Sequence, residues 1–281
     1  MQSQQKPTIT RFIVEFCLIE LILSIPFWLV TYFARVGALG NLGLNNGYPL
    51  INWSWTPAIS ACILAFHHDG IRGVRQLLAR CVDFRRMRSR LGWLLPLYLL
   101  WPVIIGVMYL TAIFNGQNPP APEFTWQVPW TYVILIVGVL GEELGWTGYL
   151  VDPLQDRFGA LRGAIIVGLM WATFHGGVFV AYGWSVSWIF WQGLYLVAAR
   201  ILFVWIYNNT GRSLFAIALL HPTFGCYYGL WPVNADGLPN FYDPAILALT
   251  TIFIALVVVA VYGPKTLSRT RPQLLTPSQS T

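Results

Sequence analysis

Charged residues are scarce in this 281-residue chain: Asp, Glu, Lys and Arg together make up 10% of it. Apolar residues make up 56%, and the chain has 14 tryptophans. Because a soluble domain carries about 25% charged residues, this composition excludes an ordinary soluble protein and indicates an integral membrane protein. The 17 Lys and Arg residues are grouped in short segments between apolar runs, so the positive charge does not indicate a nucleic-acid partner.

Recognisable metal-binding motifs are also missing. The four cysteines lie in or beside apolar segments without C-x-x-C spacing, and they are Cys17, Cys62, Cys81 and Cys226. This pattern argues against a zinc site built from thiolates, and no H-E-x-x-H motif is present. We therefore predict no cofactor, although glutamate and histidine side chains leave a divalent metal as the less favoured alternative.

Long apolar runs are the main feature that is present, and a bilayer-spanning helix needs about 20 such residues. The runs cover residues 12–34, 49–67, 92–114, 129–150, 162–181, 185–208, 212–231 and 243–263. The second run is the weakest, because Asn52, Ser54 and Pro57 interrupt it. The sequence predicts an all-α fold, a polytopic membrane bundle of about eight transmembrane helices.

The bundle is predicted to have the lipid bilayer as a partner, and the positions of lysine and arginine predict its orientation there. These residues cluster before the first run, between the second and third, and after the fourth, sixth and eighth. The positive-inside rule places these segments, and both the N- and C-termini, in the cytoplasm of a multi-pass cell-membrane protein. We expect a prokaryotic inner or plasma membrane. Residues 70–91 are interpreted as a loop that sets this topology, with an amphipathic helix on the inner leaflet as the alternative.

No internal repeat or linker divides the chain. Residues 1–264 are therefore predicted to form a single multi-pass membrane domain. Residues 265–281 are polar and rich in Ser, Thr and Pro, which is typical of a disordered tail.

Two adjacent glutamates, Glu142 and Glu143, interrupt the fourth apolar run. A carboxylate at the centre of a membrane helix costs roughly 2.5–3.5 kcal/mol on insertion scales, so this pair predicts a function. Neighbours on a helix point about 100° apart, so one glutamate can face a cavity while the other meets a neighbouring helix. Gly141 and Gly145 form a G-x-x-x-G pattern around them, which predicts the close approach of another helix.

Two later apolar runs each contain a single histidine. His175 lies among aromatic residues, where a lone histidine is more often a hydrogen-bonded packing residue than a catalyst. His221 is followed by Pro222, which disfavours helical geometry at the histidine. Together with the glutamates, these histidines predict one buried polar site built from three helices. Arg200, in the sixth run, is the candidate charge partner of a glutamate.

Three short motifs resemble those of the CPBP family of intramembrane endopeptidases, the CAAX-protease and bacteriocin-processing group also called Abi. Residues 141–150 (GEELGWTGYL) resemble the first motif, E-E-x-x-x-R. Residues 171–175 (WATFH) resemble the second, F-x-x-x-H, with Trp171 in the aromatic position. His221 stands where the third motif, H-x-x-x-N, begins. The similarity covers about residues 125–230.

The resemblance implies an eight-helix bundle that holds an endopeptidase site within the membrane. Its substrate would be a membrane-associated peptide or lipidated protein, including prenylated ones, and a glutamate and a histidine would activate the water. By motif position, Glu142 and His221 would activate the water, His175 would stabilise the oxyanion, and Glu143 completes the set of catalytic candidates. We expect these residues to converge around a cavity that opens toward the cytoplasm.

Two positions depart from the family pattern. Thr147 stands where the first motif has arginine, so its hydroxyl can bond Glu143 but supplies no charge. Gly225 stands where the third motif has asparagine, and it supplies no side-chain donor. Loss of one oxyanion donor costs about 10²–10³ in rate.

These departures keep a second interpretation open: a catalytically inactive membrane scaffold that binds peptides or lipidated tails. A third interpretation is a proton- or ion-coupled transporter that uses the glutamates as a relay. The lack of repeated halves argues against it.

Overall fold

The structure is a computed structural model, and it describes residues 8–39, 53–234 and 237–269. Every regular element in these ranges is helical, apart from one isolated β-bridge between Val233 and Pro239. The predicted all-α fold is therefore confirmed. Most of the predicted disordered tail, 265–281, lies outside the described residues. Its first residues pack against the bundle: Leu267 is fully buried, and its carbonyl accepts a hydrogen bond from Asn209.

The long helices follow the predicted apolar runs closely. They are α1 (Ile9–Arg35), α2 (Thr56–Ala79), α4 (Leu94–Phe114), α5 (Gln127–Gly145), α7 (Ala160–Tyr182), α8 (Val186–Asn209), α9 (Leu214–Tyr228) and α10 (Pro244–Tyr262). The remaining described elements are short: the helices α3 (Arg85–Arg88) and α6 (Asp152–Phe158), a π-helical turn over Trp146–Val151, and three 3₁₀ turns over Trp53–Trp55, Arg80–Val82 and Leu91–Trp93. Among the described residues, six helical segments are long and apolar enough to cross a membrane, and α9 is a shorter apolar helix.

These helices form the polytopic bundle of a multi-pass membrane protein. The predicted number of eight spans stays a prediction, because α2 is not among the six long apolar segments. The location of both termini in the cytoplasm stays a prediction.

The second predicted run differs most from the structure. Residues 49–52 lie outside the described ranges, and α2 begins at Thr56 and continues to Ala79. The helix bends at Gly70, whose φ of 61° is readily adopted only by glycine. The interpretation of residues 70–91 as a plain loop is therefore wrong for the first part of that segment, where the buried Leu77 packs against the core.

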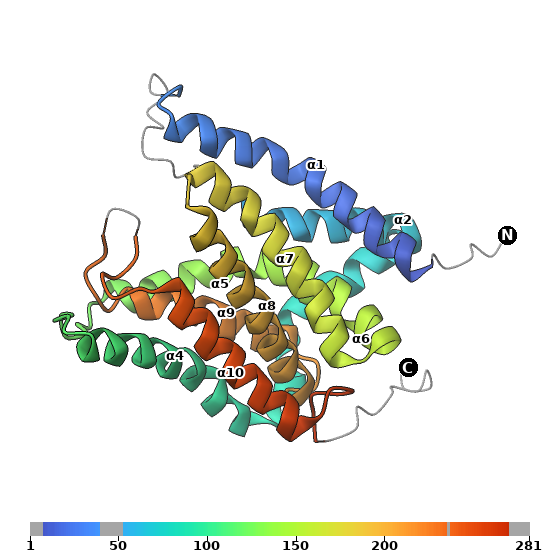
Figure 1. The fold of residues 1–281 in the computed structure, drawn as a ribbon. Coiled ribbons are helices and arrows are strands. Elements are labelled where there is room, and N and C mark those ends of the chain that lie inside the picture. Colours follow the sequence, from blue (N-terminus) through green and yellow to red (C-terminus); the bar gives the residue numbers. More distant parts are fainter. Residues whose placement is uncertain (1–7, 40–52, 235–236, 270–281) are drawn as a thin grey trace, which may run out of the picture.

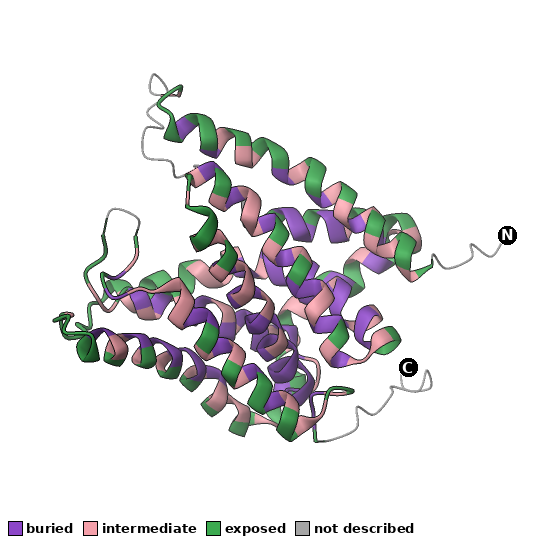
Figure 2. Ribbon diagram, viewed as in Figure 1, coloured by how far each residue is buried: buried purple, intermediate pink, exposed green. Residues whose placement is uncertain are grey.

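α8 lies at the centre of the bundle, between α7 and α10 (Figures 1 and 2). Most of its second half is buried, including Arg200, Leu202 and Phe203. The outer helices instead expose large apolar side chains such as Ile22 of α1 and Phe253 of α10. An apolar exterior around a buried polar centre suits a bundle surrounded by lipid.

The predicted close helix approach occurs between α5 and the start of α2. A Cβ atom added at Gly141 would lie 2.8 Å from the carbonyl oxygen of Ser54. A Cβ at Gly145 would overlap the backbone of Pro57. Only glycine therefore fits at these positions, and the G-x-x-x-G pattern brings α2 against the turn of α5 that carries the two glutamates.

Candidate active site

Glu143, on the last turn of α5, forms a buried ion pair with Arg200 of α8. Arg200 Nη1 lies 2.9 Å from Glu143 Oε2, and both side chains are 0% exposed. The hydroxyl of Thr147 donates to the same carboxylate oxygen, and Arg200 Nη1 also lies 3.1 Å from Thr147 Oγ1. The predicted charge partner is thus in contact with a glutamate, and α8 supplies the positive charge that Thr147 lacks.

The guanidinium of Arg200 is also placed by an aromatic ring. It lies over Trp171 of α7, with its Cζ 4.2 Å from the ring centroid. A cation over the face of an indole is stabilised by the ring quadrupole, most strongly where water is excluded. Arg200 therefore joins α5 to α7 as well as to its own helix.

The second oxygen of Glu143 is bound to His221 of α9. His221 Nδ1 lies 2.9 Å from Glu143 Oε1. The pairing of His221 with Glu142 that motif position implies is therefore not found, because the imidazole faces the neighbouring glutamate. α9 runs through Pro222 without a break. Both carboxylate oxygens of Glu143 are engaged, one by His221 and the other by Arg200 and Thr147.

Glu142 points toward α7 instead. Its Oε2 accepts a hydrogen bond of 3.0 Å from Trp171 Nε1, and the side chain is buried. One turn further along α7, His175 Nδ1 lies 3.1 Å from the carbonyl oxygen of Trp171. A ring nitrogen facing a carbonyl must carry the proton, so the neutral His175 has its lone pair on Nε2. The sequence predicted the residues but not these partners.

Trp171 makes more contacts in the site than the sequence predicts. The sequence identifies it only as the aromatic residue of the second motif. In the structure its ring lies between the two histidines, with centroid distances of 5.0 Å to His175 and 5.5 Å to His221. Its indole N–H binds Glu142 and its ring face carries Arg200. Because a buried indole N–H needs a hydrogen-bond acceptor, a tryptophan in this apolar run indicates a polar partner nearby.

The two histidines share a cavity of about 230 Å³. Most of its wall is aromatic, and the glutamates lie behind it rather than in it. Leu238 and Tyr242, from the connection between α9 and α10, line its other end. The expected opening of the cavity toward the cytoplasm stays a prediction.

The turn after the glutamates is a π-helix over Trp146–Val151, and such turns often mark functional sites. Arg80 stabilises it from the end of α2 by donating to the carbonyl of Gly148 and to Asp152 and Tyr207. Burial favours the neutral form of Arg80, but Tyr207 and Asp152 outweigh it and raise the pKa of the guanidinium. Arg80 therefore stays charged and fixes the turn, a role that the topology argument did not predict.

Another buried carboxylate, Glu20 of α1, has only hydroxyl partners among the described residues. It accepts hydrogen bonds from Ser24, Thr56 and Ser60, at 3.1, 2.7 and 2.7 Å. Thr56 and Ser60 belong to α2, so this cluster ties α1 to the helix that packs on Gly141. Its role is structural support behind the site.

The described residues contain no group of three or more His, Cys, Asp or Glu side chains arranged to hold a metal ion. The oxygens of Glu143 are already engaged by an arginine, a hydroxyl and an imidazole. These contacts do not fit the ligand set that a divalent cation needs.

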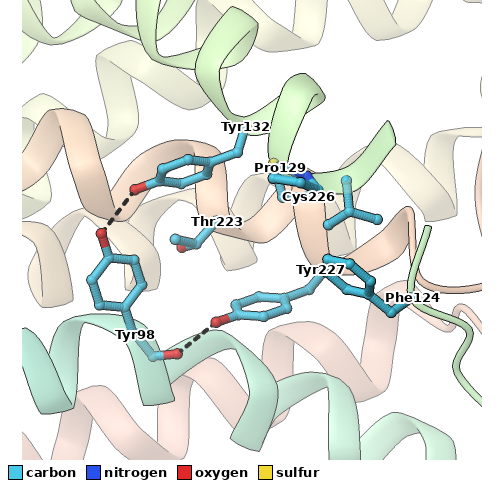
Figure 3. A pocket seen from close by; sticks show the side chains of 8 residues that line it. Tyr98, Phe124, Pro129, Tyr132, Thr223, Cys226 and Tyr227 are labelled. Carbon is cyan, nitrogen blue, oxygen red and sulfur yellow. Dashed lines mark hydrogen bonds between the residues drawn. The ribbon is translucent and has the colours of Figure 1, made fainter. Parts of the chain in front are cut away.

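A separate cavity of about 230 Å³ lies between α4, α5 and α9 (Figure 3). Three tyrosines form part of its wall, with the hydroxyls of Tyr98 and Tyr132 3.1 Å apart and the Tyr227 hydroxyl on the Tyr98 carbonyl. Its lining includes no histidine and no acidic residue. Its lining includes the Cys226 thiol but no base that could activate it or a water, so the histidine-lined cavity is the candidate active site.

Comparison with known proteins supports this choice. A family model described as "Type II CAAX prenyl endopeptidase Rce1-like" matches residues 124–227. The CAAX prenyl protease 2 of Methanococcus maripaludis is 22% identical over 180 residues, which is 61% of this chain and 64% of that protein. The match thus spans less than two thirds of the curated relative's length. The family match contains both glutamates, both histidines and Arg200.

Proposed function

Because the chain belongs to the CPBP family, we propose that it is an intramembrane endopeptidase that hydrolyses a peptide bond of a membrane-associated protein or peptide. Prenylated tails are the first candidates, since the names of the matching family and relative refer to prenyl substrates. The observation that carries the proposal is that His175 and His221 line one cavity while Glu142 and Glu143, directly behind its wall, bind Trp171 and His221 of that wall.

Hydrolysis of an amide needs a base that activates water. We assign this step to Glu142 with His175. Glu142 keeps one carboxylate oxygen on Trp171, and His175 directs Nδ1 to the carbonyl of the same residue. His175 lines the cavity, and in its neutral form Nε2 is the proton-accepting nitrogen of the ring.

Hydrolysis also needs a donor for the oxyanion of the tetrahedral intermediate. We assign this role to His221, which lines the cavity and has its Nδ1 fixed by Glu143. The ring can donate to the oxyanion from Nε2 only in the form that carries a proton on both nitrogens. This assignment exchanges the roles that motif position implies for His175 and His221. Glu143 is a positioning residue, because its two oxygens are taken by Arg200, Thr147 and His221.

The two motif departures have different consequences for the rate. Arg200 supplies the cation that Thr147 does not, so Glu143 stays compensated in its buried position. Gly225 itself supplies no side-chain donor where the motif has asparagine, and an added Cβ there would meet only the Leu135 methyl at 3.4 Å. We therefore propose a slow enzyme. The missing donor is also the observation that favours the second candidate, an inactive scaffold that binds lipidated tails.

The test is cleavage of an internally quenched, farnesylated peptide by the purified protein in detergent or liposomes, with the products identified by mass spectrometry. Glu142→Gln and His221→Ala should abolish turnover. Glu15→Gln is the matched control, because this glutamate lies on α1 and pairs with Arg11 away from the site. EDTA should leave the rate unchanged. Cleavage that survives both site variants rejects the assignment, and peptide binding without any cleavage establishes the scaffold instead.

A further inference from the structure

Gln192 and Tyr242 form a hydrogen-bonded pair of polar side chains in a cavity whose wall is mostly aromatic. Gln192 of α8 is 4% exposed, and it lines the same cavity as His175 and His221. Its Nε2 donates to the hydroxyl of Tyr242, which also lines the cavity. Within the described ranges this is the one hydrogen bond of the Gln192 side chain, so its amide oxygen has no donor there.

The position of Gln192 on α8 relates it to the reacting groups. Gln192, Leu196 and Arg200 are spaced four residues apart and therefore share one face of the helix. A rise of 1.5 Å per residue puts Gln192 about 12 Å along α8 from Arg200, which holds Glu143.

A carboxamide in an aromatic wall needs a partner, because an unpaired polar group away from water is costly. A substrate main chain in an extended conformation offers an N–H donor at every residue except proline. The hydroxyl of Tyr242 holds one end of the carboxamide and thereby limits the directions in which its oxygen can point.

We propose that Gln192, oriented by Tyr242, is a substrate-binding residue that accepts a hydrogen bond from a main-chain N–H of the peptide close to the scissile bond. The inference rests on the proposed function for the identity of the ligand as a peptide. It adds a recognition point that neither glutamates nor histidines provide.

The test uses farnesylated peptides in which one main-chain amide at a time is replaced by an ester, which removes a single N–H. Binding is measured on the Glu142→Gln protein, so that no peptide is consumed. One ester analogue should bind about 3- to 10-fold more weakly than the parent peptide. Adding Gln192→Leu should weaken the parent peptide by a similar factor and remove the difference between parent and ester.

Tyr242→Phe is the second variant, since it removes only the orienting hydroxyl. It should reduce the penalty of the same ester, even if Gln192→Leu does not fold. The proposal is overturned if no ester is discriminated, if the same ester penalty persists in both variants, or if no peptide binds. Gln192-dependent binding without turnover in the parent protein would leave this proposal standing and reject hydrolysis alone.

Discussion

Arg200 and Glu143 form an ion pair across the centre of the bundle, 2.9 Å apart and without exposure to solvent. The first motif of the family places its arginine on the same helix as the glutamates, at the position of Thr147. Here the cation comes from α8, and Thr147 remains as a hydroxyl that contacts both charged groups. The charge that compensates Glu143 is therefore present, although it stands at a different place in the sequence.

Removing this cation should leave an uncompensated buried carboxylate. We expect Arg200→Leu to destabilise the protein by about 3–5 kcal/mol, seen as a large fall in Tm in detergent. Adding Glu143→Gln should recover part of this loss, because the buried charge is then removed as well. An Arg200→Leu protein as stable as the parent would show that the pair does not hold the bundle together.

Restoring the motif arginine alone should be harmful. Thr147→Arg would place a second cation beside Arg200, against one carboxylate, and the excess buried charge should cost about 3–5 kcal/mol. The double variant Thr147→Arg, Arg200→Leu should be more stable than Thr147→Arg, since one cation is again present. Thr147→Val is the control for loss of the hydroxyl. Equal stability of the single and double variants would contradict the view that a cation at position 147 and the Arg200 guanidinium neutralise the same carboxylate.

Restoring the motif asparagine should be beneficial. Gly225 lies one turn beyond His221, and an added Cβ would meet only the methyl of Leu135. Gly225→Asn should raise kcat for the farnesylated reporter by up to about 10²-fold if its amide reaches the oxyanion. Gly225→Ala is the matched control, with no expected gain. A kcat for Gly225→Asn no higher than that of Gly225→Ala would place the oxyanion elsewhere.

The close contact between α5 and α2 predicts a contrast between two neighbouring glycines. A methyl group at Gly145 would overlap the backbone of Pro57, whereas at Gly148 the nearest atom is a Leu214 methyl at 3.4 Å. We expect Gly145→Ala to cost about 1–3 kcal/mol or more through overpacking. Gly148→Ala should stay within about 0.5 kcal/mol of the parent. Thermal unfolding of the two variants side by side checks this, and equal losses would contradict it.

Much of the fold could be predicted from apolar runs, because a membrane span requires a length that few other elements have. α7, predicted over 162–181, covers Ala160–Tyr182. α2 was predicted less well, because polar residues interrupt its start and arginines occupy its second part. The sequence shows that Arg80 is charged. It does not show that Arg80 donates hydrogen bonds to Asp152 and Tyr207.

The site residues could be predicted as a set, but their pairing could not. Adjacent glutamates point about 100° apart, and the rotation of α5 decides which one meets which histidine. That rotation depends on Gly141 and Gly145 packing against α2. For the same reason the sequence predicts that Arg200 pairs with a glutamate, but it does not predict which one.

Glu142 is proposed to activate water beside the histidine-lined cavity, and kcat measures this contribution. The decisive comparison is between the parent and Glu142→Gln proteins on the same farnesylated reporter, with peptide affinity determined separately. We expect kcat to fall by at least about 10²-fold while affinity is kept, because only the base is removed. A Glu142→Gln protein that cleaves the reporter at the parental rate would contradict it.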